Sequence, residues 1–278
     1  MITEPGVYDL DEVDYHADPV PGGSLSSTGA RRILPPGCPA LLRWERQHPV
    51  TRAEYDLGHA AHRLVLGVGA DLARIDAEDW RTKAAKAARD DARAGGRVPL
   101  LAHQHDEVHA MARALREHPV ASVLLDAHHG RAEQSLIWRD PDTGVWCRGR
   151  VDWLRDQHVD RAILVDYKTT TNAAVAAIAR SVAQYGYHQQ ADWYLDGARR
   201  VGAVDEDAAY LLVVQERTAP YLVSVVEMDA YALAVGAERN ARAREIYARC
   251  DAAGDWPGYA TDITLIGLPA WADRLEDA

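Results

Sequence analysis

The 278-residue sequence predicts an α/β (α+β) fold, with a central mixed sheet that contains an antiparallel meander and is flanked by helices. Three observations lead to this prediction. Residues 133–170 contain three successive apolar-rich runs of strand character, and residues 140–144 (DPDTG) form a strong hairpin signal between the first two. Segments with helical periodicity lie before and after these runs. Two further strands, at about 208–216 and 221–227, are expected to complete the sheet.

The remaining elements follow from breakers, caps and periodicity. Residues 1–23 are rich in proline and glycine and are expected to be irregular. The sequence then predicts helices before the strands at about 27–34, 40–47, 54–67, 76–94, 103–118 and 119–127, and later ones at about 172–183, 186–200 and 229–250. We expect a single domain over residues 1–278, made of a mainly helical part (1–127), a core (128–250) and an irregular tail (251–278).

Composition limits the functional classes. The net charge of −11 argues against a generic nucleic-acid binder, although residues 29–67 are locally basic. No apolar run approaches the roughly 20 residues that span a bilayer. The acidic N-terminus also lacks a signal-peptide core, so a cytoplasmic protein without membrane contact is expected. Cys38, Cys147 and Cys250 are far apart and odd in number, which favours neither a disulfide framework nor a zinc or iron–sulfur site.

The three strand runs each carry a carboxylate: Glu133, Asp152 and Asp166. Side chains alternate along a strand, so Asp166 and Lys168 project from the same face. Buried carboxylates need a compensating cation or hydrogen bonds. Asp152, Asp166 and Glu133, with the carbonyl of Tyr167, are the kind of oxygen ligands that Mg²⁺ prefers. Lys168 beside them could orient or deprotonate a metal-bound water and offset the negative charge that builds up on the phosphate during phosphodiester hydrolysis. The alternative is three surface acids and an ordinary Lys–Asp pair.

Other polar residues allow two interpretations. Ser26, Ser27 or Thr28 is either a simple helix N-cap or part of a phosphate-contacting helix start with Arg31 and Arg32. A lone helical histidine such as His62 is more often structural than a ligand. The helical stripe of Tyr187, Gln190 and Tyr194 is more often core packing, but a glutamine in the middle of such a stripe needs a partner.

Taken together, these motifs resemble the PD-(D/E)xK nuclease superfamily, in its RecB-like branch, and most closely the RecE-type phage exonucleases, with lambda exonuclease more distant. The matching motifs, in the family's order, are Gly58-x-x-x-His62, Glu133, GRVDWL with Asp152, DYKTT with Asp166 and Lys168, and Tyr187-x-x-Gln190-x-x-x-Tyr194. The resemblance implies metal ligands at His62, Asp152 and Asp166 and a catalytic Lys168. It also implies that Gln190 and Tyr194 position the substrate strand and the lysine. The triplet has Asp in place of the commoner Glu, and the cluster cysteines of some relatives are missing, so no iron–sulfur cluster is expected.

The resemblance also implies an activity. It is Mg²⁺-dependent degradation of linear double-stranded DNA from its ends, 5′ to 3′, with Mn²⁺ as a substitute ion. The 3′ single strands would serve recombination through a separate single-strand annealing protein, and relatives form homo-oligomeric rings. Two alternatives are an endonuclease of the same fold, which alone would nick a closed circle, and a non-catalytic DNA-binding relative. The complete set of acids and lysine argues against the latter.

Overall fold

The computed structural model describes residues 1–48, 56–155 and 161–268, with only the backbone for residues 56–59. Within these residues a seven-stranded sheet has the order β1-β5-β6-β7-β8-β9, and β2 pairs with β6. Its strands are β1 (Gly6–Tyr8), β2 (Leu25–Ser26), β5 (Gly130–Arg139), β6 (Trp146–Arg155), β7 (Ile163–Thr170), β8 (Ala209–Glu216) and β9 (Val223–Glu227). The predicted turn at residues 157–160 lies outside the described residues.

The sheet is mixed, which confirms the predicted fold class. The strands β5, β6 and β7 form an antiparallel meander, whereas β7 and β8 are parallel and β8 and β9 are antiparallel. Parallel neighbours need a crossover connection. The helices α8 (Val175–Tyr185) and α9 (Tyr187–Arg200) supply it between β7 and β8.

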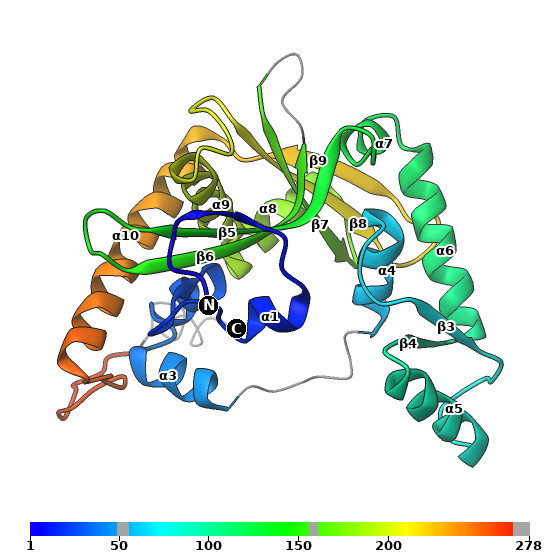
Figure 1. Ribbon diagram of the computed structural model, residues 1–278, viewed down its shortest axis with the longest axis horizontal. Coiled ribbons are helices and arrows are strands. Elements are labelled where there is room, and N and C mark those ends of the chain that lie inside the picture. Colours follow the sequence, from blue (N-terminus) through cyan, green and yellow to red (C-terminus); the bar gives the residue numbers. More distant parts are fainter. Residues whose placement is uncertain (49–55, 156–160, 269–278) are drawn as a thin grey trace, which may run out of the picture.

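The helix α9 packs on one face of the sheet together with α10 (Ala230–Ala253) (Figure 1). The principal core lies between them and contains the fully buried Trp138 and Trp193, whose ring centroids are 5.3 Å apart. The close approach of α9 to β5 depends on Gly197, because a Cβ at this position would lie 2.6 Å from the Trp138 ring. This packing holds α9 close above β5 and β6.

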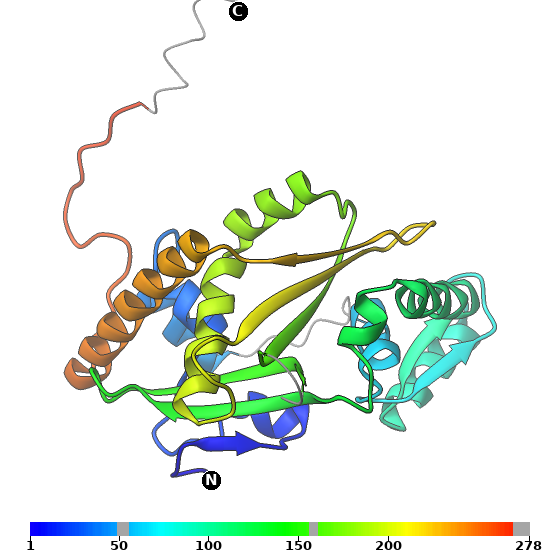
Figure 2. The same ribbon diagram turned by 90° about the horizontal axis from the view of Figure 1, so that it is seen from above.

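A second core covers the other face at one end of the sheet. The helices α4 (Asp56–Leu66), α6 (Ala102–Glu117) and α7 (Ala121–Leu124) pack there against Trp153, Tyr167 and Val213. A small parallel pair, β3 (Leu72–Ile75) and β4 (Val98–Leu101), and the helix α5 (Lys83–Ala94) extend this region into a lobe beside the sheet (Figure 2). The lobe brings α4 next to the sheet strand β7.

The N-terminal region is more ordered than predicted. Residues expected to be irregular form β1, which pairs with β5, and the helix α1 (Glu12–His16). The next helices, α2 (Ser27–Arg32) and α3 (Pro39–Gln47), lie close to their predicted places. The predicted helix at 76–94 starts too early, because Thr82 caps α5 by accepting a hydrogen bond from the N–H of Ala85. The strands β3 and β4 were also missed, since each is only four residues long and pairs with a distant segment.

The described part of the C-terminal tail has no helix or strand after α10 ends at Ala253. Trp256 anchors its start, with its ring centroid 5.4 Å from that of Tyr247. Among the described residues, no helix combines the length and apolar character required to cross a membrane.

Candidate active site

Two neighbouring strands carry the carboxylates of the candidate site. Trp153 on β6 pairs with Val165 on β7 in antiparallel register. Asp152 precedes Trp153 by one residue and Asp166 follows Val165 by one residue, so in this antiparallel arrangement the two acids face each other. Asp152 also accepts a hydrogen bond from the backbone N–H of Tyr167 at 2.9 Å. The strand register therefore brings together two acids that are separate in the sequence.

Asp166 is the most buried member of the site, with a side chain that is 1% exposed. Lys168 forms an ion pair with it, as expected for two side chains on one face of a strand. Gln190 on α9 donates a hydrogen bond to the second carboxylate oxygen at 2.8 Å, and its own amide oxygen lies 3.4 Å from a donor nitrogen of Arg31. Gln190 thus has the partner that its buried position requires, and it fixes Asp166.

The predicted aromatic stripe on α9 divides into two parts. The ammonium group of Lys168 lies 5.4 Å from the ring centroid of Tyr187, within the range of a cation–π interaction. Tyr194 is buried and packs beneath β6, where a Cβ on Gly149 would come within 2.8 Å of its ring. Tyr187 and Gln190 therefore reach the candidate site, whereas Tyr194 supports the strand that carries Asp152.

Burial and charge perturb the groups of this cluster. Burial, and next the Asp166 carboxylate, raise the pKa of Asp152 to about 6. For Lys168, burial alone would lower the pKa, but Asp166 and Asp152 outweigh it and hold this pKa above its ordinary value. Two ionised carboxylates and one ammonium leave a net negative charge in a mostly buried place. A bound cation would relieve the repulsion between the two acids.

His62 approaches the site from α4 on the other side of β7. Its Nε2 lies 3.2 Å from the Tyr167 carbonyl oxygen and 3.9 Å from a carboxylate oxygen of Asp152. The metal-binding role that the family resemblance implies for His62 stays a prediction. The surroundings of Gly58 and the side chain of His59, also part of that motif region, lie outside the described residues.

The donor set fits a divalent cation that keeps part of its water shell. The carboxylates of Asp152 and Asp166, the carbonyl of Tyr167 and the imidazole of His62 converge on one region. Among the described residues, no group of three His, Cys, Asp or Glu side chains is arranged to hold an ion. Mg²⁺ usually binds one or two carboxylates and retains several waters, so an incomplete protein cage suits it.

Glu133 stands apart from the two facing acids. It forms an ion pair with Arg150 of β6, and its backbone has a φ of 56°, in the left-handed region. The antiparallel pairing of β5 and β6 skips this residue and Asp152, which would oppose each other in a regular ladder. The described contacts thus join Glu133 to an arginine, and they do not join it to Asp152 or Asp166.

The N-terminal candidates have identifiable local partners. Ser26 caps α2 by accepting a hydrogen bond from the N–H of Gly29 at 3.1 Å, so the simple N-cap interpretation describes its contact. Ser27 is buried, and its hydroxyl has no partner among the described residues. Arg31 reaches Gln190, and Arg32 forms an ion pair with Glu45. Of these four residues, Arg31 is the one that contacts the site.

Two supporting residues were missed from the sequence. Gln215 on β8 is fully buried and accepts a hydrogen bond from the Tyr167 hydroxyl at 2.6 Å, while its amide donates to the Met111 carbonyl at 2.9 Å. It thereby fixes the strand segment between Asp166 and Lys168. A glutamine directly after the apolar run of β8 was the available signal. Arg150, the partner of Glu133, had no comparable local signal.

Comparisons with known proteins agree with this architecture. The model of a family described as a PDDEXK-like domain of unknown function (DUF3799) matches residues 74–268. The crystal structure of a "putative exonuclease" from Eubacterium rectale is similar with a TM-score of 0.59 and 8% identity, over 96% of this chain and 99% of that chain. At this identity the likeness shows a shared fold alone. The structure of SSO0001 has a TM-score of only 0.31 at 13% identity, over 68% of this chain and 84% of that chain.

No curated protein matches the sequence. The matched family segment includes both facing acids and the lysine, but it excludes His62 and the N-terminal helices. The resemblance to the PD-(D/E)xK superfamily is thereby confirmed. Since the match covers more than half of the sequence, the chain belongs to the PDDEXK-like family DUF3799.

Proposed function

We propose that this protein is a Mg²⁺-dependent deoxyribonuclease that hydrolyses phosphodiester bonds in linear double-stranded DNA from its ends. The observation that carries the proposal is the cluster of Asp152, Asp166 and Lys168, in which two facing carboxylates share a buried place with one ammonium. PD-(D/E)xK nucleases generally use divalent metal ions, and the donor set here fits one.

Each residue of the cluster has a distinct task. Asp152, Asp166 and the Tyr167 carbonyl would hold the ion, with His62 beside them. The chemistry that a divalent cation supplies when bound is Lewis-acid stabilisation of phosphate charge and a lower pKa of the attacking water. Lys168 places a positive charge where negative charge develops on the phosphate oxygens.

Positioning of these groups depends on hydrogen bonds from α9 and β8. Gln190 holds one oxygen of Asp166 and leaves the other to Lys168. Gln215 fixes Tyr167 through its hydroxyl. Residues that orient metal ligands in this way often change metal affinity or activity by about 10–100-fold when they are removed.

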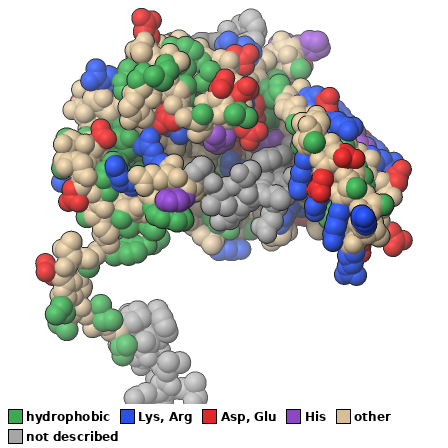
Figure 3. All heavy atoms as spheres, turned by 60° about the horizontal axis from the view of Figure 1, so that its bottom comes forward, with side chains coloured by type: hydrophobic (Ala, Val, Ile, Leu, Met, Phe, Trp, Pro, Cys, Tyr) green, Lys and Arg blue, Asp and Glu red, His purple; other side chains and the backbone are tan. Residues whose placement is uncertain are grey.

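The finer features of the proposed reaction are supported by the RecE-type motifs. We propose 5′ to 3′ polarity, 3′ single-stranded products, assembly into a homo-oligomeric ring and use of the product by a single-strand annealing protein. Figure 3 shows Lys and Arg side chains, with Asp and Glu side chains among them, on the lobe that carries α5, and the α5 sequence KAAKAARDDARA contains both kinds. The Lys and Arg side chains of this mixed surface would favour contact with the DNA backbone.

The test is digestion of end-labelled linear duplex DNA beside a covalently closed circle, with Mg²⁺ or with EDTA. We expect shortening of the linear DNA from its ends only with Mg²⁺, and an intact circle. A label at the 5′ end and a label at the 3′ end, in separate reactions, report the polarity. A nicked circle would replace the exonuclease proposal with an endonuclease.

Two variants distinguish the activity of this site from that of a contaminating nuclease. Lys168→Ala should abolish cleavage, whereas Arg242→Ala, at an exposed arginine of α10, removes the same charge away from the site and should leave cleavage unchanged. Linear DNA that stays intact with wild-type protein in both Mg²⁺ and Mn²⁺ would leave a non-catalytic DNA-binding role.

A further inference from the structure

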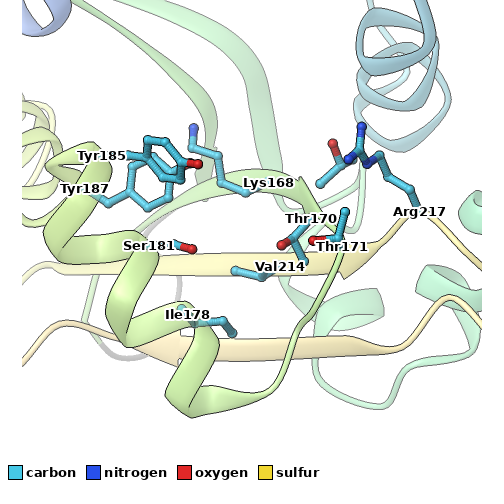
Figure 4. Close-up of a pocket in the computed structure, with 10 residues that line it drawn as sticks. Lys168, Thr170, Thr171, Ile178, Ser181, Tyr185, Tyr187, Val214 and Arg217 are labelled. Carbon is cyan, nitrogen blue, oxygen red and sulfur yellow. The ribbon is translucent and has the colours of Figure 1, made fainter. Parts of the chain in front are cut away.

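A groove of about 410 Å³ opens directly beside Lys168. It follows the end of β7 and is bounded on the other side by α8 (Figure 4). Its lining residues are Lys168, Thr169, Thr170, Thr171, Ile178, Ser181, Tyr185, Tyr187, Val214 and Arg217. The volume lies within the range of small-ligand sites, and one end is the candidate active site itself.

The groove is suited to an anion, although the chain carries a net charge of −11. Its lining contains two cations and no carboxylate, with threonine and serine hydroxyls between them. Figure 4 shows Arg217 near Thr170 and Thr171, at the end away from the two tyrosines. The backbone N–H of Arg217 donates to the Thr170 carbonyl at 3.0 Å, which fixes this arginine two residues along β7 from Lys168. That separation is roughly 7 Å of strand.

The other end of the groove has an aromatic wall. The rings of Tyr185 and Tyr187 have centroids 5.7 Å apart and are tilted by 37°. Gly186 between them has a φ of 69° and turns the chain from α8 into α9, so both rings lie beside the groove (Figure 4). Tyr187 is engaged with Lys168, but Tyr185 is 55% exposed. An exposed aromatic ring beside a groove that carries positive charge is a common arrangement for stacking an unpaired base.

We propose that this groove holds one unpaired nucleotide next to the bond that is cut. Its base stacks on Tyr185, the phosphate that is cut lies at Lys168, and the next phosphate pairs with Arg217. This inference rests on the proposed nuclease function and adds a requirement to it. The nucleotide must leave the duplex to enter the groove, and stacking on Tyr185 offsets the stacking that it loses in the duplex.

The experiment compares kcat/KM of wild type, Tyr185→Ala and Tyr185→Phe on duplexes with a normal or an abasic residue at the first or second position from the end. Stacking on an aromatic side chain contributes about 1–3 kcal/mol per base, so Tyr185→Ala should lose about 5- to 150-fold. Tyr185→Phe should retain the activity. The loss should disappear when the abasic residue occupies one of the two positions, because no base remains to stack.

The arginine is tested in parallel. Arg217→Ala should lower kcat/KM on normal DNA and have no effect on a substrate with a neutral methylphosphonate at the linkage beside the one that is cut. The matched controls are Tyr231→Ala and Arg242→Ala, two exposed residues of α10 that do not line the groove. Both controls should behave like wild type.

The outcomes distinguish this inference from the nuclease proposal. If wild type cleaves DNA and Tyr185→Ala is equally active, or is equally impaired on normal and abasic substrates, the groove proposal is wrong and the nuclease proposal stands. If wild type cleaves nothing, the nuclease proposal fails. Binding of an oligonucleotide with 2-aminopurine at its end then decides about the groove, since stacking on Tyr185 should quench the fluorescence of wild-type complexes and not of Tyr185→Ala complexes.

Discussion

Replacing Asp152 by asparagine should stabilise the protein when no divalent ion is present. The Asp152 side chain is only 16% exposed and faces a second carboxylate, that of Asp166. Burial and this neighbour raise the pKa of Asp152 to about 6, so its ionised form is unfavourable in the folded state. An asparagine has nearly the same shape and can still accept the hydrogen bond from the Tyr167 N–H.

The size of the expected stabilisation follows from the increase in the pKa of Asp152. An increase of the Asp152 pKa from 3.8 to about 6 corresponds to about 3 kcal/mol of unfolding free energy at pH 8. The folded pKa lies above the unfolded value, so this penalty is absent below about pH 4, grows between about pH 4 and pH 6 and is complete above about pH 6. Burial of the new amide offsets part of the gain. We therefore expect about 1–3 kcal/mol, or about 2–6 °C in Tm.

The assay is thermal unfolding in EDTA between pH 5 and pH 8, with Asp251→Asn, an exposed acid of α10, as the control. The Tm of Asp152→Asn should exceed that of wild type at pH 8, and the difference should shrink towards pH 5. Added Mn²⁺ should raise the Tm of wild type and have little effect on Asp152→Asn, because binding stabilises only a folded state that keeps the ligand. Calorimetric titration should show the same loss of Mn²⁺ affinity.

The interpretation of the facing acids would be refuted by an Asp152→Asn variant that is less stable than wild type in EDTA at pH 8. It would also be refuted by a stability difference that does not change with pH. Unchanged Mn²⁺ affinity in this variant would contradict the assignment of Asp152 as a metal ligand. These results are independent of whether the protein cuts DNA.

The remaining predictions concern the lysine, the glutamine and a close helix–sheet contact. Lys168→Ala should abolish cleavage but retain Mn²⁺ binding in calorimetry, since an ammonium is not a ligand; lost Mn²⁺ affinity would contradict this role. Gln190→Ala should lower kcat by about 10–100-fold with a small change in Tm, because it orients a metal ligand; full activity would show that the hydrogen bond is dispensable. Gly197→Ala should destabilise the protein by about 1–3 kcal/mol in urea unfolding, because the new Cβ would lie 2.6 Å from the Trp138 ring; wild-type stability would mean that this contact relaxes freely.

The meander of the sheet was predictable because its signals are local. Alternating apolar residues and the turn at 140–144 define β5 and β6, and the acids on these strands come with them. The short strands β1, β3 and β4 were not predicted. Each is three or four residues long, and β1 pairs with β5, more than 120 residues away, so its hydrogen-bond partners are invisible in a local pattern.

In the candidate site, too, some features were predictable from local sequence and others were not. Alternation along β7 was enough to place Asp166 and Lys168 on one face, and the ion pair between them follows from the period of a strand. The sequence also indicated that Gln190 needs a polar partner, but not that the partner is Asp166. That contact depends on how closely α9 approaches the sheet, which Gly149 and Gly197 permit.

What the sequence determined by itself was therefore the set of chemical groups: oxygen donors and an amine on successive strands, with an acidic total charge. Only the tertiary structure decided which groups meet. It placed Asp152 against Asp166 and joined Glu133 to Arg150. It also opened a groove between β7 and α8 beside Lys168. The physical reason is that residue type and period two act within one strand, whereas register, helix packing and burial depend on segments far apart in the chain.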